Sequence, residues 1–454
     1  MTRFTASLGL LLLLATAGCA ASPGLDLDAE ALLDPESCRG CHPVQFEQWS
    51  GSMHAYTGID PLFLAQLRLG QEDTNGELGD HCISCHSPVA VRAGATVDGS
   101  NLPDVPAYLR GVTCAACHQI DSVSRDHNAS HVMATDDNLR GGILDPVQNT
   151  AHGSVYSFAH DRNSRISSDT CGTCHCVFNK NGVHVERTLH EWRDTVFATG
   201  DLTVQTCGQC HMRGVDGVAA VSDGAGRTAE QMPIRRIHDH SWPGVDTAAL
   251  DFPQRDRQVE LIQDELDTTL LARLCVTPIA GGVELVVRLE NIRGGHSFPS
   301  GSAIDRRVWL ELIASADGQE VFSTGVVGDD EAVATTGDPN LWLMRDRHFD
   351  ADGEPVDFNW LTESVQSDLL PAATTNDPTD PDFYHFVERS WPLYGVSPDR
   401  VQMRVRMRAV GLEVLDQLVE RAGLDPVVPA EQPTWNLGST QLTWEGQLGS
   451  CVPY

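Results

Sequence analysis

The order of hydrophobic and polar positions divides the chain into parts of different character. In the C-terminal part, Val283, Leu285, Val287 and Leu289 alternate with mostly polar neighbours, and residues 401–408 repeat the pattern. A period of two is typical of half-buried β-strands. The same pattern predicts strands at 307–314, 320–324, 383–388 and 440–444, with a hairpin turn at 317–318. We therefore expect an antiparallel β-sandwich domain over residues 246–454, with one helix at 412–422.

Residues 35–245 have no comparable periodicity. Short helices are predicted at 44–55, 61–69 and 186–198, between turn-rich stretches such as 98–103 and 222–226. A segment of this kind cannot build a large core from its own side chains. We expect a mostly irregular and α-helical domain whose core is completed by bound groups.

The first residues have the pattern of an export signal. Arg3 precedes an apolar run at 8–15, which is too short to span a bilayer. Residues 16–19, Thr-Ala-Gly-Cys, resemble a bacterial lipobox, in which the cysteine is lipidated. We expect a lipoprotein-type signal peptide at 1–19, lipidation of Cys19 and a tether at 20–34. The alternative is ordinary secretion, with cleavage at a small residue nearby.

The charge balance restricts the partners. The chain has 63 acidic and 31 basic residues, for a net charge of −32. Nucleic acid and anionic lipid surfaces would be repelled. A basic redox partner would be attracted, although a salty habitat alone would also produce such acidity, and we favour the habitat.

One pentapeptide, Cys-x-x-Cys-His, occurs five times and uses ten of the 14 cysteines. The copies are Cys38/Cys41/His42, Cys82/Cys85/His86, Cys114/Cys117/His118, Cys171/Cys174/His175 and Cys207/Cys210/His211. This is the attachment signature of haem c: the cysteines form thioethers with the vinyl groups, and the histidine binds the iron. Zinc sites also use Cys-x-x-Cys, but they need no histidine after each pair, and five pairs leave one unmatched. We therefore expect five covalently bound haem c groups in a domain at 35–245.

Several segments of this domain resemble the cytochrome c-552/c-554 family of multihaem cytochromes. They are 38–55, with Trp49 and His54 after the first motif, 111–120, 171–175, Glu191-Trp192-Arg193, and 207–212. The resemblance implies an electron-transfer protein with closely spaced haems. Its relatives include the haem cores of hydroxylamine oxidoreductase and pentahaem nitrite reductase. The Cys-x-x-Cys-Lys motif typical of the catalytic haem of that reductase is absent here, which weakens the case for nitrite reduction.

The resemblance also implies second iron ligands among the remaining histidines. His54, His152 and His240 lie in segments similar to family ligand segments, and His131 is a further candidate, with His127 as its alternative. His238 is a weaker choice than His240, and His81 could reach another haem. We interpret His160, His184 and His190 as structural.

A further candidate for an iron ligand lies in the β-domain, in the segment Gly294-Gly-His-Ser-Phe-Pro-Ser-Gly301. It resembles the Gly-His-x-Phe/Leu-Pro-Thr-Gly loop of β-domains attached to multihaem cytochromes. Glycines allow close approach to a macrocycle, and Pro299 stiffens the loop. We expect His296 to bind a haem iron of the first domain and to fix the docking of the two acidic domains. The alternative is a tight turn with an exposed histidine.

Three further cysteines lie outside the motifs and the signal. Cys275 and Cys451 could form a disulfide in an oxidising compartment, leaving Cys176 unpaired. Asp350, Asp352 and Asp357 faintly resemble a cation loop, but a solvated acidic turn is the better interpretation.

These observations favour an exported electron carrier without catalytic residues. It would lie on the periplasmic side of the cell envelope, anchored by lipid, and exchange electrons with redox proteins there. One alternative is an oxidoreductase that acts on a small nitrogen or sulfur compound at a five-coordinate haem. Another is a building block of a haem polymer.

Overall fold

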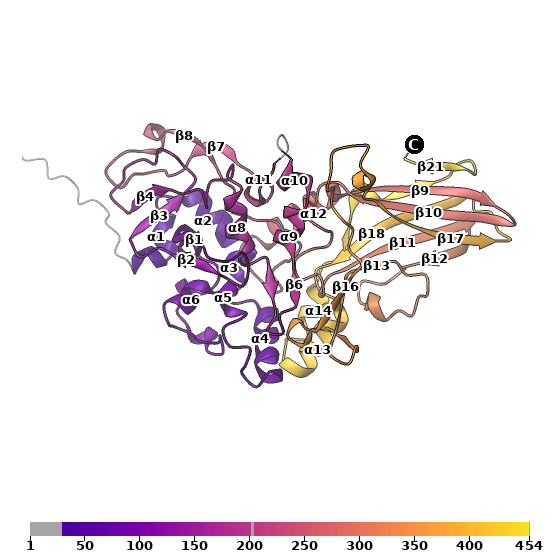
Figure 1. The fold of residues 1–454 in the computed structure, drawn as a ribbon, viewed down its shortest axis with the longest axis horizontal. Coiled ribbons are helices and arrows are strands. Elements are labelled where there is room, and N and C mark those ends of the chain that lie inside the picture. The colour runs from indigo at the N-terminus through magenta and orange to yellow at the C-terminus, as the bar shows by residue number, and fades with distance from the viewer. Residues whose placement is uncertain (1–29, 201–203, 454) are drawn as a thin grey trace, which may run out of the picture.

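The computed structural model describes residues 30–200 and 204–453. Figure 1 shows two regions side by side, with short helices and small sheets in the first and long strands in the second. The expected signal at 1–19, with Cys19, lies outside the described residues, as does the tether before residue 30. Within the described part, no helix is both long and apolar enough to span a membrane.

The first region consists of short helices and two-stranded sheets. Its α-helices are α1 (Glu36–Arg39), α2 (Pro43–Ser50), α3 (Met53–Tyr56), α4 (Pro61–Asp73), α5 (Ile83–His86), α6 (Pro88–Arg92), α7 (Cys114–His118), α8 (Ile166–Gly172), α9 (Thr188–Arg193), α10 (Val196–Thr199) and α11 (Cys207–His211). The strand pairs are β1 (Ile120–Val123) with β2 (His131–Met133), β3 (Asn138–Gly141) with β4 (Gly153–Tyr156), β5 (Val177–Phe178) with β6 (His184–Glu186), and β7 (Val215–Val218) with β8 (Ile234–Ile237). The predicted helices 44–55 and 186–198 each form two helices, and the predicted helix 61–69 lies within α4.

The second region is built on two antiparallel sheets. The first has the order β17 (Val387–Tyr394), β10 (Gly282–Asn291), β9 (Leu270–Ile279) and β21 (Ser450–Val452). The second has the order β12 (Gln319–Thr324), β11 (Arg307–Ala316), β18 (Arg400–Arg408) and β19 (Trp435–Asn436), with β13 (Leu343–Met344) beside β11 and β20 (Leu442–Trp444) beside β18. A small sheet contains β15 (Pro355–Val356), β14 (Asp346–Phe349) and β16 (Ser364–Ser367), and the helices are α12 (Arg255–Thr269), α13 (Leu412–Ala422) and α14 (Val428–Glu431).

The alternating residues of β10 face the core, as their pattern predicts. Val283, Leu285 and Val287 are at most 1% exposed. They share one cluster of buried residues with Leu310 and Leu312 of β11, in the other sheet. Each such side chain contributes about 1.5–3 kcal/mol through burial. The prediction of antiparallel strands is thus confirmed, and the two sheets bury one common set of side chains.

Several elements of the second region differ from the prediction, among them strand β9, which the prediction omits. The segment expected as a strand at 383–388 begins as the 3-10 turn Pro381–Phe383, and β17 starts only at Val387. Helix α12 was not expected, because most of its positions are polar and few of its side chains, such as Ile262 and Leu266, are buried.

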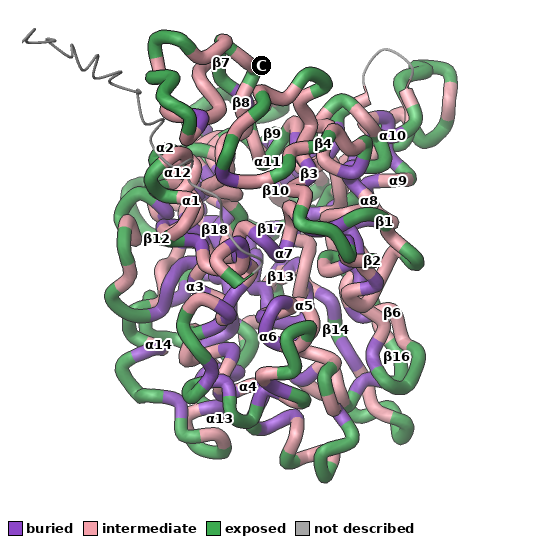
Figure 2. The backbone as a smooth tube through the Cα atoms, turned by 90° about the vertical axis from the view of Figure 1, so that its left-hand side faces the viewer, coloured by how far each residue is buried: buried purple, intermediate pink, exposed green. Residues whose placement is uncertain are grey.

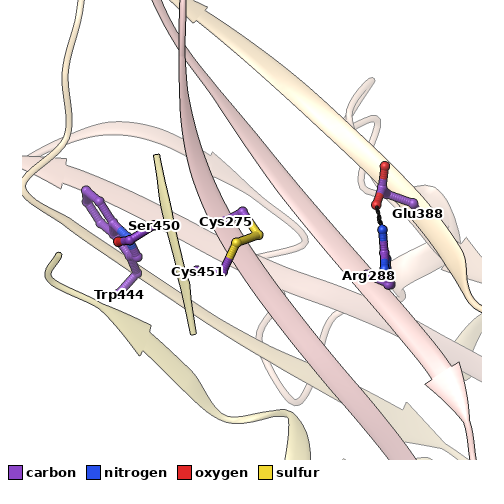
Figure 3. The surroundings of a disulfide bond; sticks show 6 residues. All are labelled: Cys275, Arg288, Glu388, Trp444, Ser450 and Cys451. Carbon is purple, nitrogen blue, oxygen red and sulfur yellow. Dashed lines mark hydrogen bonds and ion pairs between the residues drawn. A yellow bond between two sulfur atoms is a disulfide. The ribbon is translucent and has the colours of Figure 1, made fainter. Parts of the chain in front are cut away.

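The disulfide between Cys275 and Cys451 is present (Figure 3). Strand β21 pairs with β9 so that the two residues lie directly opposite each other. Trp444 Nε1 also donates a hydrogen bond to Ser450 Oγ at 2.9 Å. The C-terminal strand is therefore held to its neighbours covalently and by hydrogen bonds, whereas Cys176 is buried with a free thiol.

The two turns singled out in the sequence have simple structures. Asp317 and Gly318 connect β11 to β12 with positive φ angles of 49° and 75°, as a tight hairpin requires. At the expected acidic turn, the Asp350 carboxylate accepts hydrogen bonds from the backbone N–H groups of Asp352 and Glu354, both at 2.9 Å. The turn therefore satisfies its own carboxylate.

The two regions are joined by packing and by buried charge. Helix α4 lies beside α13 in both views (Figures 1 and 2), and Leu69 and Leu415 belong to one buried cluster there. Arg187 donates a hydrogen bond at 2.8 Å to Asp346, whose side chain is only 1% exposed. Docking of the regions therefore does not depend on the His296 loop alone.

Candidate haem-binding site

A cavity of about 1090 Å³, bounded mainly by the first region and partly by the second, is lined by every cysteine and histidine of the five motifs. This volume exceeds the ~300–1,000 Å³ typical of sites for one small molecule. The five histidines predicted as second ligands also line the cavity: His54, His131, His152, His240 and His296. The structure thus gathers all of the predicted binding residues around one space.

Each motif forms a single helical turn. The N–H of His42 donates to the carbonyl of Cys38 at 2.8 Å, and His175 donates to Cys171 at 3.2 Å. Positions three and four residues apart share one face of a helical turn. Both cysteines and the histidine therefore face the same side, which is the arrangement that haem attachment requires.

Backbone carbonyls orient the motif histidines. The Nδ1 atoms hydrogen-bond to carbonyl oxygens in three cases: His42 to Ala219 at 2.7 Å, His118 to Arg140 at 2.6 Å, and His211 to Pro243 at 3.0 Å. A ligating histidine usually donates its second ring N–H to such an acceptor. Nε2 is then left to bind a metal.

Four motif histidines have a second imidazole ring nearby: in three pairs the ring planes lie within 28° of each other, and in the fourth, His54 with His175, they are 65° apart. The ring centroids are 6.3 Å apart for His42 and His152, and 6.4 Å apart for His54 and His175, His118 and His240, and His211 and His296. Two imidazoles on opposite sides of one iron have centroids about 6.3 Å apart, taking a metal–nitrogen bond of about 2.0 Å and about 1.15 Å from nitrogen to ring centre. The four pairs therefore fit axial ligation of haem iron.

Three of the opposing histidines are oriented in the same way as the motif histidines. Their Nδ1 atoms lie near neighbouring carbonyls: His152 with Gly153 at 3.0 Å, His240 with His238 at 3.0 Å, and His296 with Ser297 at 2.9 Å. Nε2 is again free for a metal.

His118 has a second stacked neighbour, His160, at 5.9 Å. The Nε2 atom of His160 is occupied by a hydrogen bond to the Cys117 carbonyl at 2.9 Å. The spacing of this pair is also shorter than axial ligation requires. His240 is therefore the better partner for His118.

His131 is not brought opposite a motif histidine. Its Nε2 lies 3.2 Å from the Thr170 carbonyl and also contacts the Thr173 hydroxyl. Its alternative, His127, lies outside the cavity and contacts the Asp126 carboxylate at 3.0 Å. Neither residue has the geometry of the four pairs.

His86 differs from the other motif histidines, because no described histidine ring faces it. Phe63 stacks on its ring at 3.9 Å and 2°, and the Thr57 hydroxyl bonds to its Nδ1. His81 and His238 line the cavity, but neither ring lies opposite a motif histidine. Within the described residues, the second motif, Cys82/Cys85/His86, therefore has its own histidine but no second imidazole paired with it.

Burial keeps most of these imidazoles neutral. It lowers the pKa of His54 and of His240 to about 3, and the neutral ring is the form that binds metal. His175 behaves differently: burial lowers its pKa, but the Glu186 carboxylate, 3.6 Å from Nδ1, outweighs this and raises the pKa to about 9. A carboxylate at this position makes an imidazole a stronger ligand.

The motifs lie against one another. Neighbouring thiols of different motifs shift one another's pKa: Cys114 lowers that of Cys38, Cys174 raises that of Cys85, and Cys171 lowers that of Cys207. All five motifs line the same cavity, so their attachment sites share one space.

Trp242 is a cavity residue that we did not expect from the sequence. Its ring packs edge-on against His54 at 4.7 Å and against His240 at 5.1 Å, between two of the facing pairs. Its position two residues after His240 was the available signal. We infer that it fixes the orientation of both rings.

The His296 loop is held in a defined shape. The Asn291 side chain donates to the His296 carbonyl at 2.7 Å and accepts from the Gly294 N–H at 2.9 Å. Gly295 has a φ of +66°, in the left-handed region that favours glycine. The loop therefore directs a histidine of the second region into the cavity of the first.

Comparisons with known proteins agree with this geometry. Residues 37–119 match the sequence model of the family described as "Cytochrome c554 and c-prime". The structure is similar to that of a penta-heme cytochrome c552 from Thermochromatium tepidum, with a TM-score of 0.60, 18% identity, and coverage of 89% of this chain and 97% of that one. No curated protein matches the sequence. The family match and the similar fold support a multihaem c-type cytochrome with covalently bound haem c.

Proposed function

We propose that the chain is an exported pentahaem c-type cytochrome that transfers electrons along closely spaced haems. The observation that supports this proposal most strongly is the set of four imidazole pairs, with centroids 6.3–6.4 Å apart, around a cavity lined by all five motifs. Haem c, when bound, supplies one-electron exchange at its iron. An iron held by two histidines would have no free position for a substrate, which favours transfer over catalysis.

The roles of the chain's own residues follow from their positions. The cysteines would hold the cofactors, and the oriented imidazoles would supply nitrogen ligands to the iron. The five motifs line one cavity, which supports close spacing of the five sites. Burial of the ligands reduces access of water and so lowers the local dielectric.

The location and the partners belong to the same proposal. Lipidation at Cys19 would anchor the protein on the periplasmic side of the cell envelope, where it would meet redox proteins. The net charge of −32 argues against nucleic acid as a partner. Residues 35–245 form the haem domain, and residues 246–454 form a β-sandwich that closes one site with His296.

The direct test is a reductive titration of the purified protein, monitored optically and by electron paramagnetic resonance. The proposal predicts reversible uptake of five electrons per chain and mainly low-spin haem. Turnover of nitrite, hydroxylamine or sulfite at enzyme-like rates would contradict a pure carrier role.

A second function is favoured by one observation, the absence of a described histidine opposite His86. An iron with one axial histidine has an open position for a small ligand. The chain would then be an oxidoreductase for a small nitrogen or sulfur compound at this site. Phe63 and Thr57 would hold the His86 ring in place.

Carbon monoxide distinguishes these possibilities, because it binds reduced haem only where a position is open. Binding of one molecule per chain would support an open His86 site. If carbon monoxide does not bind to the reduced native protein, the second function is rejected and electron transfer is the one that remains.

A further inference from the structure

Three ligand-type side chains gather behind the fourth motif, outside the haem cavity. Cys176, His184 and His190 place one ligand atom each within 4.8 Å of the others. The Cys176 sulfur lies 3.1 Å from His184 Nε2. None of the three lines the haem cavity, and Cys176 belongs to no motif and no disulfide.

The three residues come from well-packed elements. Cys176 is fully buried at the start of the β5–β6 hairpin, and His184 begins β6. Phe178 of β5 stacks on the His184 ring at 4.1 Å and 9°. His190 lies on α9, with its ring 4.8 Å from that of His184. A site held by strands and a helix is pre-organised, because packing restricts its side-chain rotamers.

A carboxylate orients the third residue. His190 Nε2 donates to Asp126 at 3.0 Å, and Arg193 also binds this carboxylate. This leaves Nδ1 of His190 as the ring nitrogen available to the cluster. The arrangement is the carboxylate–histidine pair that commonly accompanies a metal ligand.

We propose that Cys176, His184 and His190 bind one Zn²⁺ ion, separate from the haems. Zinc takes nitrogen and sulfur ligands in a tetrahedral arrangement, with bonds of about 2.0–2.1 and 2.3 Å, and often has three protein ligands and one water. The ligand spacing here suits that geometry. A plain hydrogen bond between thiol and imidazole would account for Cys176 and His184, but not for His190, which the half-buried Asp126 carboxylate holds beside them.

The test uses the purified protein with its haems attached. Elemental analysis after incubation with Zn²⁺ and gel filtration should find one zinc per chain, in addition to haem iron. X-ray absorption at the zinc edge, which haem does not obscure, should detect one sulfur neighbour at about 2.3 Å. Cys176→Ser and His190→Ala should each weaken zinc binding at least tenfold, with haem content unchanged.

His127→Ala is the matched control, because His127 contacts the same Asp126 but is not among the three proposed ligands. This variant should retain zinc. The proposal is overturned if the native protein takes up no zinc, if its zinc has no sulfur neighbour, or if Cys176→Ser binds zinc as the native protein does. The X-ray absorption spectrum of the native protein shows whether sulfur binds the zinc, even if a variant fails to fold.

Discussion

Replacing His296 with alanine removes the imidazole that faces His211 at 6.4 Å, with ring planes 9° apart. No other described histidine ring is in contact with His211, so the iron at that motif should lose one axial ligand. The rest of the loop should persist, because Asn291 holds it through backbone groups. The substitution should therefore change the ligation of one haem iron and leave the fold of the loop intact.

The size of the effect follows from the number of facing pairs. Four pairs and one unpartnered motif histidine predict about one fifth high-spin haem in the native protein, and His296→Ala should raise this share to about two fifths. Docking of the regions should survive, since the Arg187–Asp346 pair and the α4–α13 packing are untouched.

The assay is quantitative electron paramagnetic resonance, combined with optical spectra before and after addition of free imidazole. Added imidazole should occupy the space left by the side chain and restore the low-spin signal. His385→Ala is the matched control: His385 contacts the Asn291 carbonyl beside the loop at 3.2 Å but faces no motif histidine. An unchanged high-spin share in His296→Ala would refute the reasoning and leave the loop as a turn only.

Three other changes test separate parts of the account. Replacing Cys275 and Cys451 with serine releases a cross-link over a sequence separation of 176 residues and should destabilise the second region by about 2–5 kcal/mol in urea unfolding followed by circular dichroism. Arg187→Ala leaves Asp346 buried without this partner and should cost about 3–5 kcal/mol in the same experiment. Cys19→Ala should move the protein from the membrane fraction to the soluble periplasmic fraction.

Each of these predictions has its own contrary result. A urea midpoint unaffected by loss of the disulfide would mean that hydrogen bonding alone holds β21. Arg39→Ala, which breaks an exposed pair with Glu36, should change stability by less than about 1 kcal/mol and calibrates the Arg187 result. Membrane association that persists in Cys19→Ala would indicate another anchor.

The sequence is most informative where a local rule determines the structure. The period of two in β10 and β18 depends only on burial of one strand face, and both strands form where that pattern predicts. The attachment motifs are equally local, since five consecutive residues carry the cysteines and the histidine. Strand β9 has the same signal at Leu270, Ala272 and Leu274, which are buried on one face.

The second ligands are not local, and they are the part that sequence reasoning alone could not pair. His152 lies 110 positions from His42, and only the folded chain brings the two rings together. Resemblance predicts His54, His152, His240 and His296 as second ligands, but it could not reveal which motif histidine each one lies near.

His131 shows the same limit of sequence reasoning, because the fold does not place this predicted ligand beside a motif histidine. Its segment looked suitable, yet tertiary contacts direct its Nε2 to Thr170 and Thr173. Long-range packing determines the orientation of the His131 ring, and no short sequence pattern encodes that orientation.

The most direct test of the central claim is the mass of the mature, denatured protein. Haem c stays attached through thioether bonds when the chain unfolds, so the mass counts the cofactors regardless of their spectra. The account predicts the mass of the processed chain plus five haems, with all five motif peptides modified after digestion. A mass with four or fewer haems would contradict it and would identify the motif that does not bind haem.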